Sequence, residues 1–252
     1  MIYVLRRTLR TFFWAALLLI ALPVSAGALW FSSQGWPGSW HEAEWSSTGT
    51  APDPAFTPEA VVRIYSARTG RWKSIFAVHS WIAVKPAGAS SWSRFEVVGW
   101  GRPIRQNAYP VDALWYSNPP VMSYELRGEE ARRAIPKIVS AISNYPHSAR
   151  GSYTIWPGPN SNTFVAHVVR QVPELKAELP ARAMGKDYLG EGLQFAPTPS
   201  QTGWQVSWNG VAGLALAWEE GLEFHVLGTT IGVDPLDLAI KLPSFGRLGL
   251  LE

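Results

Sequence analysis

The stretch Trp156-Pro-Gly-Pro-Asn-Ser-Asn-Thr-Phe-Val-Ala-His167 joins a turn to the start of a predicted helix. Its prolines and glycine favour a turn, and apolar residues with helical spacing follow the polar run. Backbone N–H groups are free in the first turn of a helix, and the helix dipole favours negative charge there. A nucleophile or an anion-binding group is well placed at this point, and Ser161 is the candidate nucleophile.

Ser161 also has a purely structural interpretation, in which its hydroxyl caps the helix. A serine cap accepts a hydrogen bond from a backbone N–H group and stabilises a helix by about 1 kcal/mol. Asn160, Asn162 and Thr163 are equally suited to this role. The local sequence leaves both interpretations of Ser161 open.

A candidate base, His79, stands in the apolar strand pattern Phe-Ala-Val-His-Ser-Trp-Ile-Ala-Val at residues 76–84. Strand alternation directs His79 to one face and its two neighbours to the other. One interpretation is a core histidine bonded to a backbone carbonyl. The other is a general base, because a serine needs a base within hydrogen-bond reach to become nucleophilic. Glu96, in the next predicted strand, either orients His79 or faces solvent.

Further candidate residues flank this pair in the sequence. We predict that Asn160, Asn162 and Thr163 contribute to a cleft or an oxyanion site beside the nucleophile. Trp81 and Trp156 are the predicted wall residues, because each stands close to a proposed catalytic residue. The chain has 14 tryptophans, which are more typical of a core than of a ligand platform.

Composition restricts the chemistry and the partners. The absence of cysteine excludes a thiol nucleophile and a cysteine-ligated zinc site. The 5 histidines have no ligand-like spacing, so we expect neither a metal nor a cofactor. The net charge of +3 comes from Arg6, Arg7 and Arg10, and the remaining 19 basic residues balance 19 acidic ones. Because there is no basic block, we expect no nucleic-acid partner.

The N-terminal segment, residues 1–31, predicts an exported protein. No charged residue occurs between Arg10 and His41, and about 20 apolar residues suffice to cross a bilayer. The preceding arginines predict a cytoplasmic N-terminus and an external body. A cleaved signal peptide ending at Ala28 is the main alternative, and a buried core helix is another. The apolar continuation to Phe31 favours an anchor in the inner membrane, whereas cleavage would give a periplasmic protein.

The rest of the chain predicts an α+β domain. Residues 32–60 are a Trp-, Ser- and Pro-rich linker, and residues 61–252 form a single domain. We expect an antiparallel sheet packed against two main helices. The predicted strands cover 61–66, 75–84, 94–100, 123–127, 153–156, 211–218 and 222–231, and the helices cover 128–145 and 162–171.

Several separated motifs resemble the bacterial family called domain of unknown function 3750. They are His-Ser-Trp-Ile-Ala-Val at 79–84, the Trp-Pro-Gly-Pro-Asn-Ser-Asn-Thr-Phe segment, Gly-Lys-Asp-Tyr at 185–188 and Lys-Leu-Pro-Ser-Phe-Gly-Arg-Leu-Gly at 241–249. The resemblance runs from about Val61 to Leu250. It implies an envelope-associated bacterial protein of uncharacterised activity.

A more distant similarity is to circularly permuted papain-like proteins, the lecithin:retinol acyltransferase-like and NlpC-type groups. In these groups a strand histidine precedes an Asn-Cys-x-x-Phe motif that opens a helix. His79 matches the histidine, and residues 160–164 match the motif with Ser161 in place of the cysteine. The resemblance implies a papain-like fold and a hydrolase or acyltransferase acting on an amide or ester. The serine departs from the pattern, because a hydroxyl is far less acidic than a thiol.

Three functions remain compatible with the sequence. The chain is a Ser/His-dependent envelope enzyme, a non-catalytic module that binds an envelope glycan, peptide or lipid in a relic papain-like cleft, or a structural protein without a ligand. The membrane itself is an expected partner, through the N-terminal helix.

Overall fold

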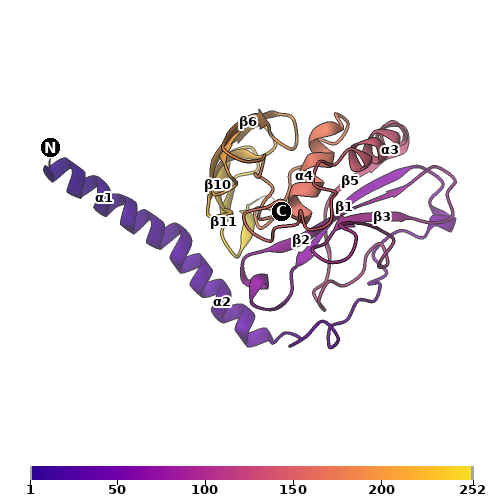
Figure 1. Cartoon of the computed structure of the whole chain (residues 1–252), viewed down its shortest axis with the longest axis horizontal. Helices are drawn as coiled ribbons and strands as arrows, with labels where there is room; N and C mark the ends of the chain where they lie inside the picture. Colours follow the sequence, from indigo (N-terminus) through magenta and orange to yellow (C-terminus); the bar gives the residue numbers. More distant parts are fainter. Residues whose placement is uncertain (1, 251–252) are drawn as a thin grey trace.

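A long apolar helix precedes a mixed α+β body that contains two antiparallel sheets (Figure 1). The structure is a computed structural model and describes residues 2–250. The apolar helix consists of α1 (Ile2–Ala16), a π-helical turn η1 (Leu17–Ala21) and α2 (Leu22–Gln34). These features confirm the α+β class and the apolar N-terminal helix.

The first sheet has five strands in the order β4-β3-β2-β1-β5. They are β1 (Val61–Arg68), β2 (Val78–Lys85), β3 (Ser93–Val97), β4 (Ile104–Gln106) and β5 (Val121–Arg127). The predicted antiparallel pairing of β2 with β3 is confirmed, with Ile82 opposite Phe95. Two short 3-10 helices, η2 (Pro54–Phe56) and η3 (Arg71–Ile75), flank β1.

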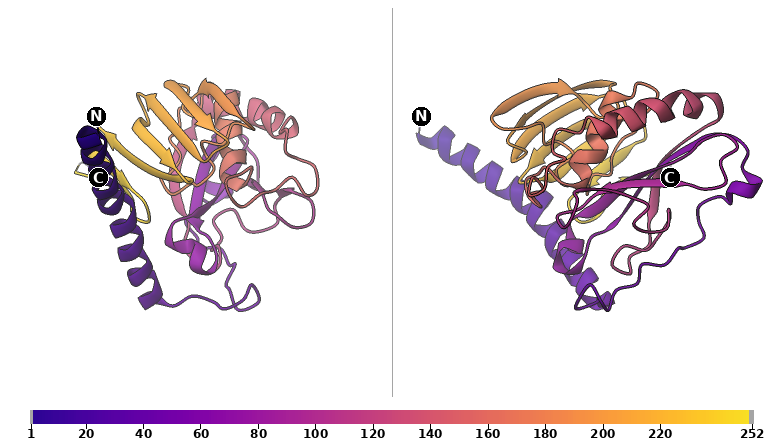
Figure 2. Two further views of the ribbon diagram at one scale, coloured as in Figure 1. Left: turned by 60° about the vertical axis from the view of Figure 1, so that its left-hand side comes forward. Right: turned by 45° about the vertical axis from the view of Figure 1, so that its right-hand side comes forward.

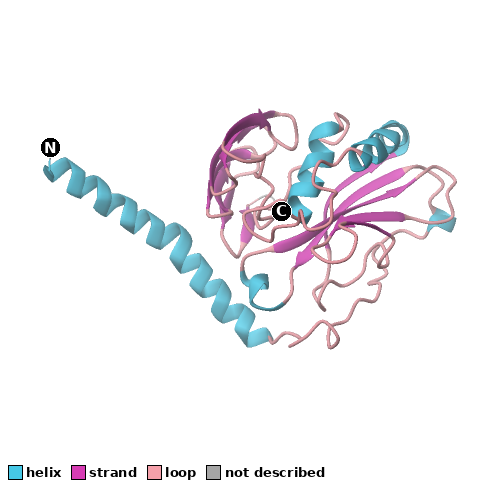
Figure 3. Cartoon of the chain, in the orientation of Figure 1, coloured by secondary structure: helices cyan, strands magenta, loops and turns pink. Residues whose placement is uncertain are grey.

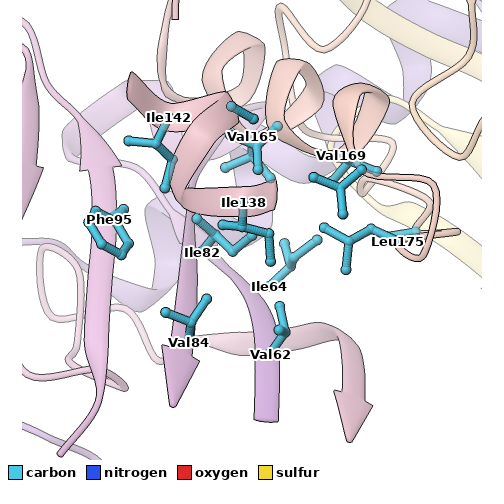
Figure 4. Packing of buried hydrophobic residues seen from close by; sticks show 14 of the residues in the cluster. Val62, Ile64, Ile82, Val84, Phe95, Ile138, Ile142, Val165, Val169 and Leu175 are labelled. Atoms are coloured by element: carbon cyan, nitrogen blue, oxygen red, sulfur yellow. The ribbon is translucent and has the colours of Figure 1, made fainter. Parts of the chain in front are cut away.

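Two helices, α3 (Gly128–Ser143) and α4 (Ser161–Gln171), cover one face of this sheet. Alternate residues of β1 and β2, such as Ile64 and Ile82, point to this face and are fully buried. They belong to the same cluster as Ile138 of α3 and Val165 of α4 (Figure 4). Burial of each such side chain contributes about 1.5–3 kcal/mol, so this cluster is the main core of the body.

Pro136 lies within α3 without ending the helix. The structure has one helix from Gly128 to Ser143. A proline cannot donate to the carbonyl four residues earlier, here that of Arg132. Both Pro136 and Arg132 are on the exposed side of α3, where water can bond to the free carbonyl.

The second sheet is a meander of seven strands in chain order. They are β6 (Leu193–Pro197), β7 (Gly203–Trp208), β8 (Ala212–Ala217), β9 (Gly221–Val226), β10 (Thr229–Asp234), β11 (Ala239–Leu242) and β12 (Gly246–Gly249). We expected one sheet, whereas the structure has two, and β6 and β7 lie where a loop was expected. The strands predicted at 211–218 and 222–231 form the β8–β9 hairpin, but the second predicted range is interrupted by a turn and continues into β10. The strand expected at 153–156 is a loop.

The apolar helix and the linker both contact the body. The α carbon of Gly27 in α2 approaches Ser244 so closely that an added Cβ would lie 2.4 Å from the serine Cβ. The Arg68 guanidinium lies 5.3 Å from the centre of the Trp30 ring. Trp45 of the linker packs against Trp115. Figures 2 and 3 show the N-terminal helix leaving the molecule on the side of the seven-stranded sheet.

Candidate functional site

A cavity of about 630 Å³ lies where β2 and α4 begin. His79 and Ser161 both line it, although 82 positions separate them in the chain. Seven large aromatic residues line it: Trp72, Phe76, Trp100, Trp115, Tyr116, Tyr153 and Trp156. The structure therefore brings the predicted nucleophile and the predicted base to one apolar cavity.

The cap of α4 is Asn160, and Ser161 is the first residue of the helix. The Asn160 side-chain oxygen accepts hydrogen bonds from the N–H groups of Asn162 and Thr163, at 2.9 and 3.2 Å. The Thr163 hydroxyl in turn accepts from the Asn160 N–H, which completes a capping box. The structural interpretation of Ser161 as the cap is therefore wrong, because a neighbouring residue performs that role.

The other polar side chains of this turn are committed to structural contacts. The Asn160 amide donates to the carbonyls of Ile155 and Met184. The Asn162 amide donates to the carbonyls of Val78 and Met184. Asn160 and Asn162 both line the cavity, but their amide donors are taken up by backbone carbonyls and are not free for an oxyanion.

Thr163 is also structural. Its hydroxyl donates to the Gly185 carbonyl at 2.7 Å, and Thr163 does not line the cavity. Gly185 has φ +88°, and an added Cβ would lie 2.5 Å from the Asn160 side-chain nitrogen. This position accepts only glycine, which explains the glycine of the Gly-Lys-Asp-Tyr motif.

Ser161 itself is only 3% exposed and lies beside Tyr153. Burial raises the pKa of the Tyr153 phenol, and hydrogen bonding with the Ser161 hydroxyl and backbone N–H opposes part of this effect. Tyr153 is therefore a protonated phenol at neutral pH. It places a second hydrogen-bond donor next to the Ser161 N–H group.

His79 is hydrogen-bonded to Glu96. The His79 Nε2 and Glu96 Oε2 atoms are 2.7 Å apart, and Arg94 donates to the same carboxylate oxygen at 2.8 Å. All three side chains are buried. The predicted orienting role of Glu96 matches this geometry, and Arg94 supplies the balancing charge.

The protonation states of this pair follow from their surroundings. Burial lowers the pKa of His79, and the opposing effect of Glu96 is smaller. Burial alone raises the pKa of Glu96, but the His79 hydrogen bond and the Arg94 charge together lower it below its ordinary value. At neutral pH a neutral imidazole therefore faces a carboxylate, so its Nε2 carries the proton and its Nδ1 has a free lone pair.

Ser161 and His79 both line the cavity, but they are not hydrogen-bonded to each other. Ser80 contacts Asn162 of α4, so strand alternation directs His79 to the opposite face of the sheet. Both residues reach the cavity because it lies at the end of the sheet. Among residues 2–250, no hydrogen bond links the Ser161 hydroxyl to His79.

The two predicted wall residues differ in position. Trp156 lines the cavity and donates to the Leu227 carbonyl at 2.9 Å. Trp81 does not line it, and this prediction is wrong. Trp81 is fully buried behind His79, where its ring lies 4.0 Å from the Arg94 guanidinium.

Three residues of the site were missed by the sequence reasoning. Trp115 stacks on His79 with ring centres 3.6 Å apart, but its proline-rich loop has no periodic signal. Tyr153 was assigned to a strand. Arg94 had a usable signal, because it stands two positions before Glu96 and so shares its face.

The described residues contain no group of three or more His, Asp or Glu side chains suited to a metal ion.

The comparisons with known proteins identify the family. Residues 59–188 match the family model described as "Protein of unknown function (DUF3750)". The chain belongs to this family. The DUF3750 match contains His79, Glu96 and Ser161 and ends at Tyr188, so it is shorter than the expected resemblance to Leu250. No curated protein and no solved structure matches the chain, and the papain-like similarity rests on the sequence pattern alone.

Proposed function

We propose that the protein is a membrane-anchored envelope hydrolase or acyltransferase that cleaves an amide or ester with Ser161 and His79. One observation carries the proposal. Ser161 is free of the capping role and shares a cavity with a histidine whose Nε2 is bonded to a buried carboxylate. A hydroxyl, a base and a residue that orients the base are the minimum set for serine acyl transfer.

The reaction begins with attack of the Ser161 hydroxyl oxygen on the substrate carbonyl carbon. The hydroxyl proton passes to His79 Nδ1, and the resulting imidazolium is stabilised by Glu96. The Tyr153 hydroxyl, which lies beside Ser161, stabilises the oxyanion. His79 then protonates the leaving amine or alcohol, and water or an acceptor alcohol releases the acyl group from Ser161.

Apo enzymes often hold catalytic groups beyond hydrogen-bond distance, and the contact tightens when substrate binds. A serine also needs stronger assistance than a cysteine, since it is not a resting anion. The Arg94–Glu96–His79 chain supports this requirement by fixing the tautomer of the base. The order of β2 and α4 in the chain supports a permuted papain-like arrangement with serine at the nucleophile position.

The membrane location is supported by the N-terminal helix. Residues Arg6–Gln34 are long and apolar enough to cross a bilayer, with a mean hydropathy of 2.1 and 12% of the apolar window buried. A core helix would be mostly buried, so this low buried fraction favours a membrane helix. Contact of Gly27 with Ser244 favours a retained anchor over a cleaved signal, and the N-terminal arginines favour an external body.

A second candidate is a non-catalytic module that binds an envelope amphiphile, glycan or peptide. The aromatic wall and the lack of a Ser161–His79 hydrogen bond favour it. In that case the cavity binds its ligand by burial of apolar groups against Trp156 and its neighbours.

The test is hydrolysis of p-nitrophenyl acyl esters by the full chain in detergent. We expect Ser161→Ala to lose the activity and His79→Ala to reduce it by roughly 10²- to 10⁴-fold, the usual contribution of a general base. Ser143→Ala, at an exposed position of α3, is the matched control and should retain the activity of the unmodified chain. Equal turnover by all four proteins would contradict the proposal.

A wild-type chain without turnover would favour the binding module if a fluorescent fatty-acid probe still bound. Trp156→Ala should then weaken binding of that probe.

A further inference from the structure

The seven-stranded sheet exposes apolar side chains on its outward face and buries polar ones on its inward face. Residues paired across antiparallel strands lie on the same face. One row of such partners runs across six strands as Trp204, Leu216, Leu222, Val233, Ile240 and Leu248. The neighbouring row is Phe195, Val206, Leu214, Phe224 and Ile231. Both rows are entirely apolar, and both are on the outward face.

This apolar face is exposed. Leu216 is 66% exposed and Phe224 is 48% exposed, and no described element covers them. Soluble monomeric proteins rarely expose a contiguous apolar patch that extends over several strands. The outward face therefore has an environment other than water.

The inward face carries the polar groups instead. Gln205, Glu223 and Lys241 alternate with the apolar rows and are buried against the body. Lys241 Nζ lies 2.7 Å from Glu223 Oε1, and Lys186 lies 2.8 Å from the other oxygen of this carboxylate. A sheet with paired charges inside and mainly apolar side chains outside is organised for an apolar surrounding.

The N-terminal helix fixes where this sheet lies relative to a bilayer. Gly27 packs on Ser244, in the turn between β11 and β12 of the sheet. Gly27 is about 25 Å of helix rise beyond Arg10, within the roughly 30 Å hydrocarbon core of a bilayer. The turn is therefore at the outer edge of that core. Figures 1 and 2 show the sheet on the side of the body from which the helix departs.

We propose that the outward face of the seven-stranded sheet is a lipid-contacting surface that lies in the outer interface of the bilayer beside the N-terminal helix. The unpaired edges of β6 and β12 make a spanning position unfavourable, because open edges are not satisfied in hydrocarbon. An interfacial position leaves these edges in the headgroup layer. Trp204 and Trp208, both exposed, belong to the residue type that prefers this layer.

Contact of this surface with lipid would also place the cavity of the proposed enzyme near the membrane. Helix α2 contacts η3, and Trp72 and Lys73 of η3 line the cavity. The contact with lipid holds the cavity wall close to the membrane. The inference rests on the retained anchor proposed above but not on the catalytic role of Ser161.

The test uses the full chain, whose lack of cysteine makes each introduced thiol unique. Single variants Leu216→Cys and Phe224→Cys are labelled with an environment-sensitive fluorophore and reconstituted in phosphatidylethanolamine–phosphatidylglycerol vesicles. Some lipids carry a nitroxide quencher on the acyl chain. Leu18→Cys, in the apolar helix, is the positive control, and Val139→Cys, 44% exposed on α3, is the matched negative control.

We expect the labels at positions 216 and 224 to lose fluorescence to the lipid quencher as the label at 18 does, while the label at 139 does not. Unquenched labels at 216 and 224 with a quenched label at 18 would overturn the inference and leave the anchor intact. An unquenched label at 18 would reject the anchor, and the inference with it. Thiol-specific cross-linking of two copies through position 224 would also overturn it, because a second copy would then cover the face.

Discussion

At the scale of single residues, the site depends on how one carboxylate fixes one imidazole. Glu96 accepts from His79 Nε2, and Trp115 stacks flat on the ring with an interplanar angle of 6°. The ring therefore has one tautomer and one orientation. In the proposed mechanism, a base fixed in this way needs no rearrangement of its own before it accepts a proton from Ser161.

The first prediction concerns pH. Burial lowers the pKa of His79 below the ordinary histidine value of about 6.5. The neutral, basic form therefore persists at pH values where an exposed histidine is protonated, and the activity falls only as pH drops through the lowered value. In the pH profile of ester hydrolysis, we expect the acid limb to lie below pH 6.5. An acid limb above that value would contradict a buried neutral base.

The candidate groups could be predicted from the sequence, but most of their contacts could not. The chemistry of Ser161, His79 and Glu96 is visible in residue type and order. The choice of Asn160 as the cap is not, because four consecutive polar residues can each cap a helix. Tertiary carbonyls, such as that of Met184, decide among them.

At the scale of elements, the start of α4 is joined to three other segments. Side chains of the turn bond to Val78 of β2, to Ile155 and to the loop at Met184 and Gly185. The position of Ser161 in the cavity is therefore set by the contacts of its neighbours.

The second prediction concerns this turn. Asn160→Ala removes a cap, which costs about 1 kcal/mol, and leaves the Ile155 carbonyl without its donor. We expect the free energy of unfolding in detergent to fall by about 2 kcal/mol. Denaturant titration of the purified chain measures it.

Two companion variants make this test specific. Asn160→Ser keeps an acceptor for the cap without placing an oxygen against the two carbonyls, and it should lose less stability than Asn160→Ala. Asn144→Ala, at the exposed end of α3, should change stability by less than about 0.5 kcal/mol. Equal losses of unfolding free energy at positions 160 and 144 would contradict a stabilising role of the α4 cap.

Elements with a clear apolar pattern were predictable. Strands β1 and β2 contain short apolar runs and are buried on both faces, and the apolar residues of α3 and α4 have helical spacing. The strand expected at Tyr153 to Trp156 is a loop, because its side chains serve the cavity rather than a sheet. Strands β6 and β7 were missed because they lie in a Pro- and Ser-rich segment and are too short to show a clear alternation.

At the scale of the whole molecule, two sheets of opposite character share one body. The five-stranded sheet buries apolar residues against α3 and α4, whereas the seven-stranded sheet buries polar residues and exposes apolar ones. The sequence could not reveal this difference, because period-two alternation does not indicate which face is inside. The N-terminal helix was predictable, because its apolar run is continuous.

The third prediction separates an anchor from a signal peptide. Gly27 and the buried Phe31 bind α2 to the body, so we expect chain extracted from membranes to keep residues 1–28. Intact-mass spectrometry measures this. An Ala26→Leu/Ala28→Leu variant, which lacks the small-residue cleavage pattern, should differ from the natural chain only by the mass of the substitutions. A natural chain that begins at Leu29 would contradict the anchor.

The most direct measurement of the central claim is covalent labelling of the full chain by a fluorophosphonate probe, with the modified residue located by mass spectrometry. Attack of an activated serine on phosphorus expels fluoride and leaves a stable phosphonyl-serine. We expect one adduct, on Ser161, that disappears in Ser161→Ala, forms far more slowly in His79→Ala and persists in Ser143→Ala. No adduct on Ser161, or labelling that His79→Ala leaves unchanged, would contradict it.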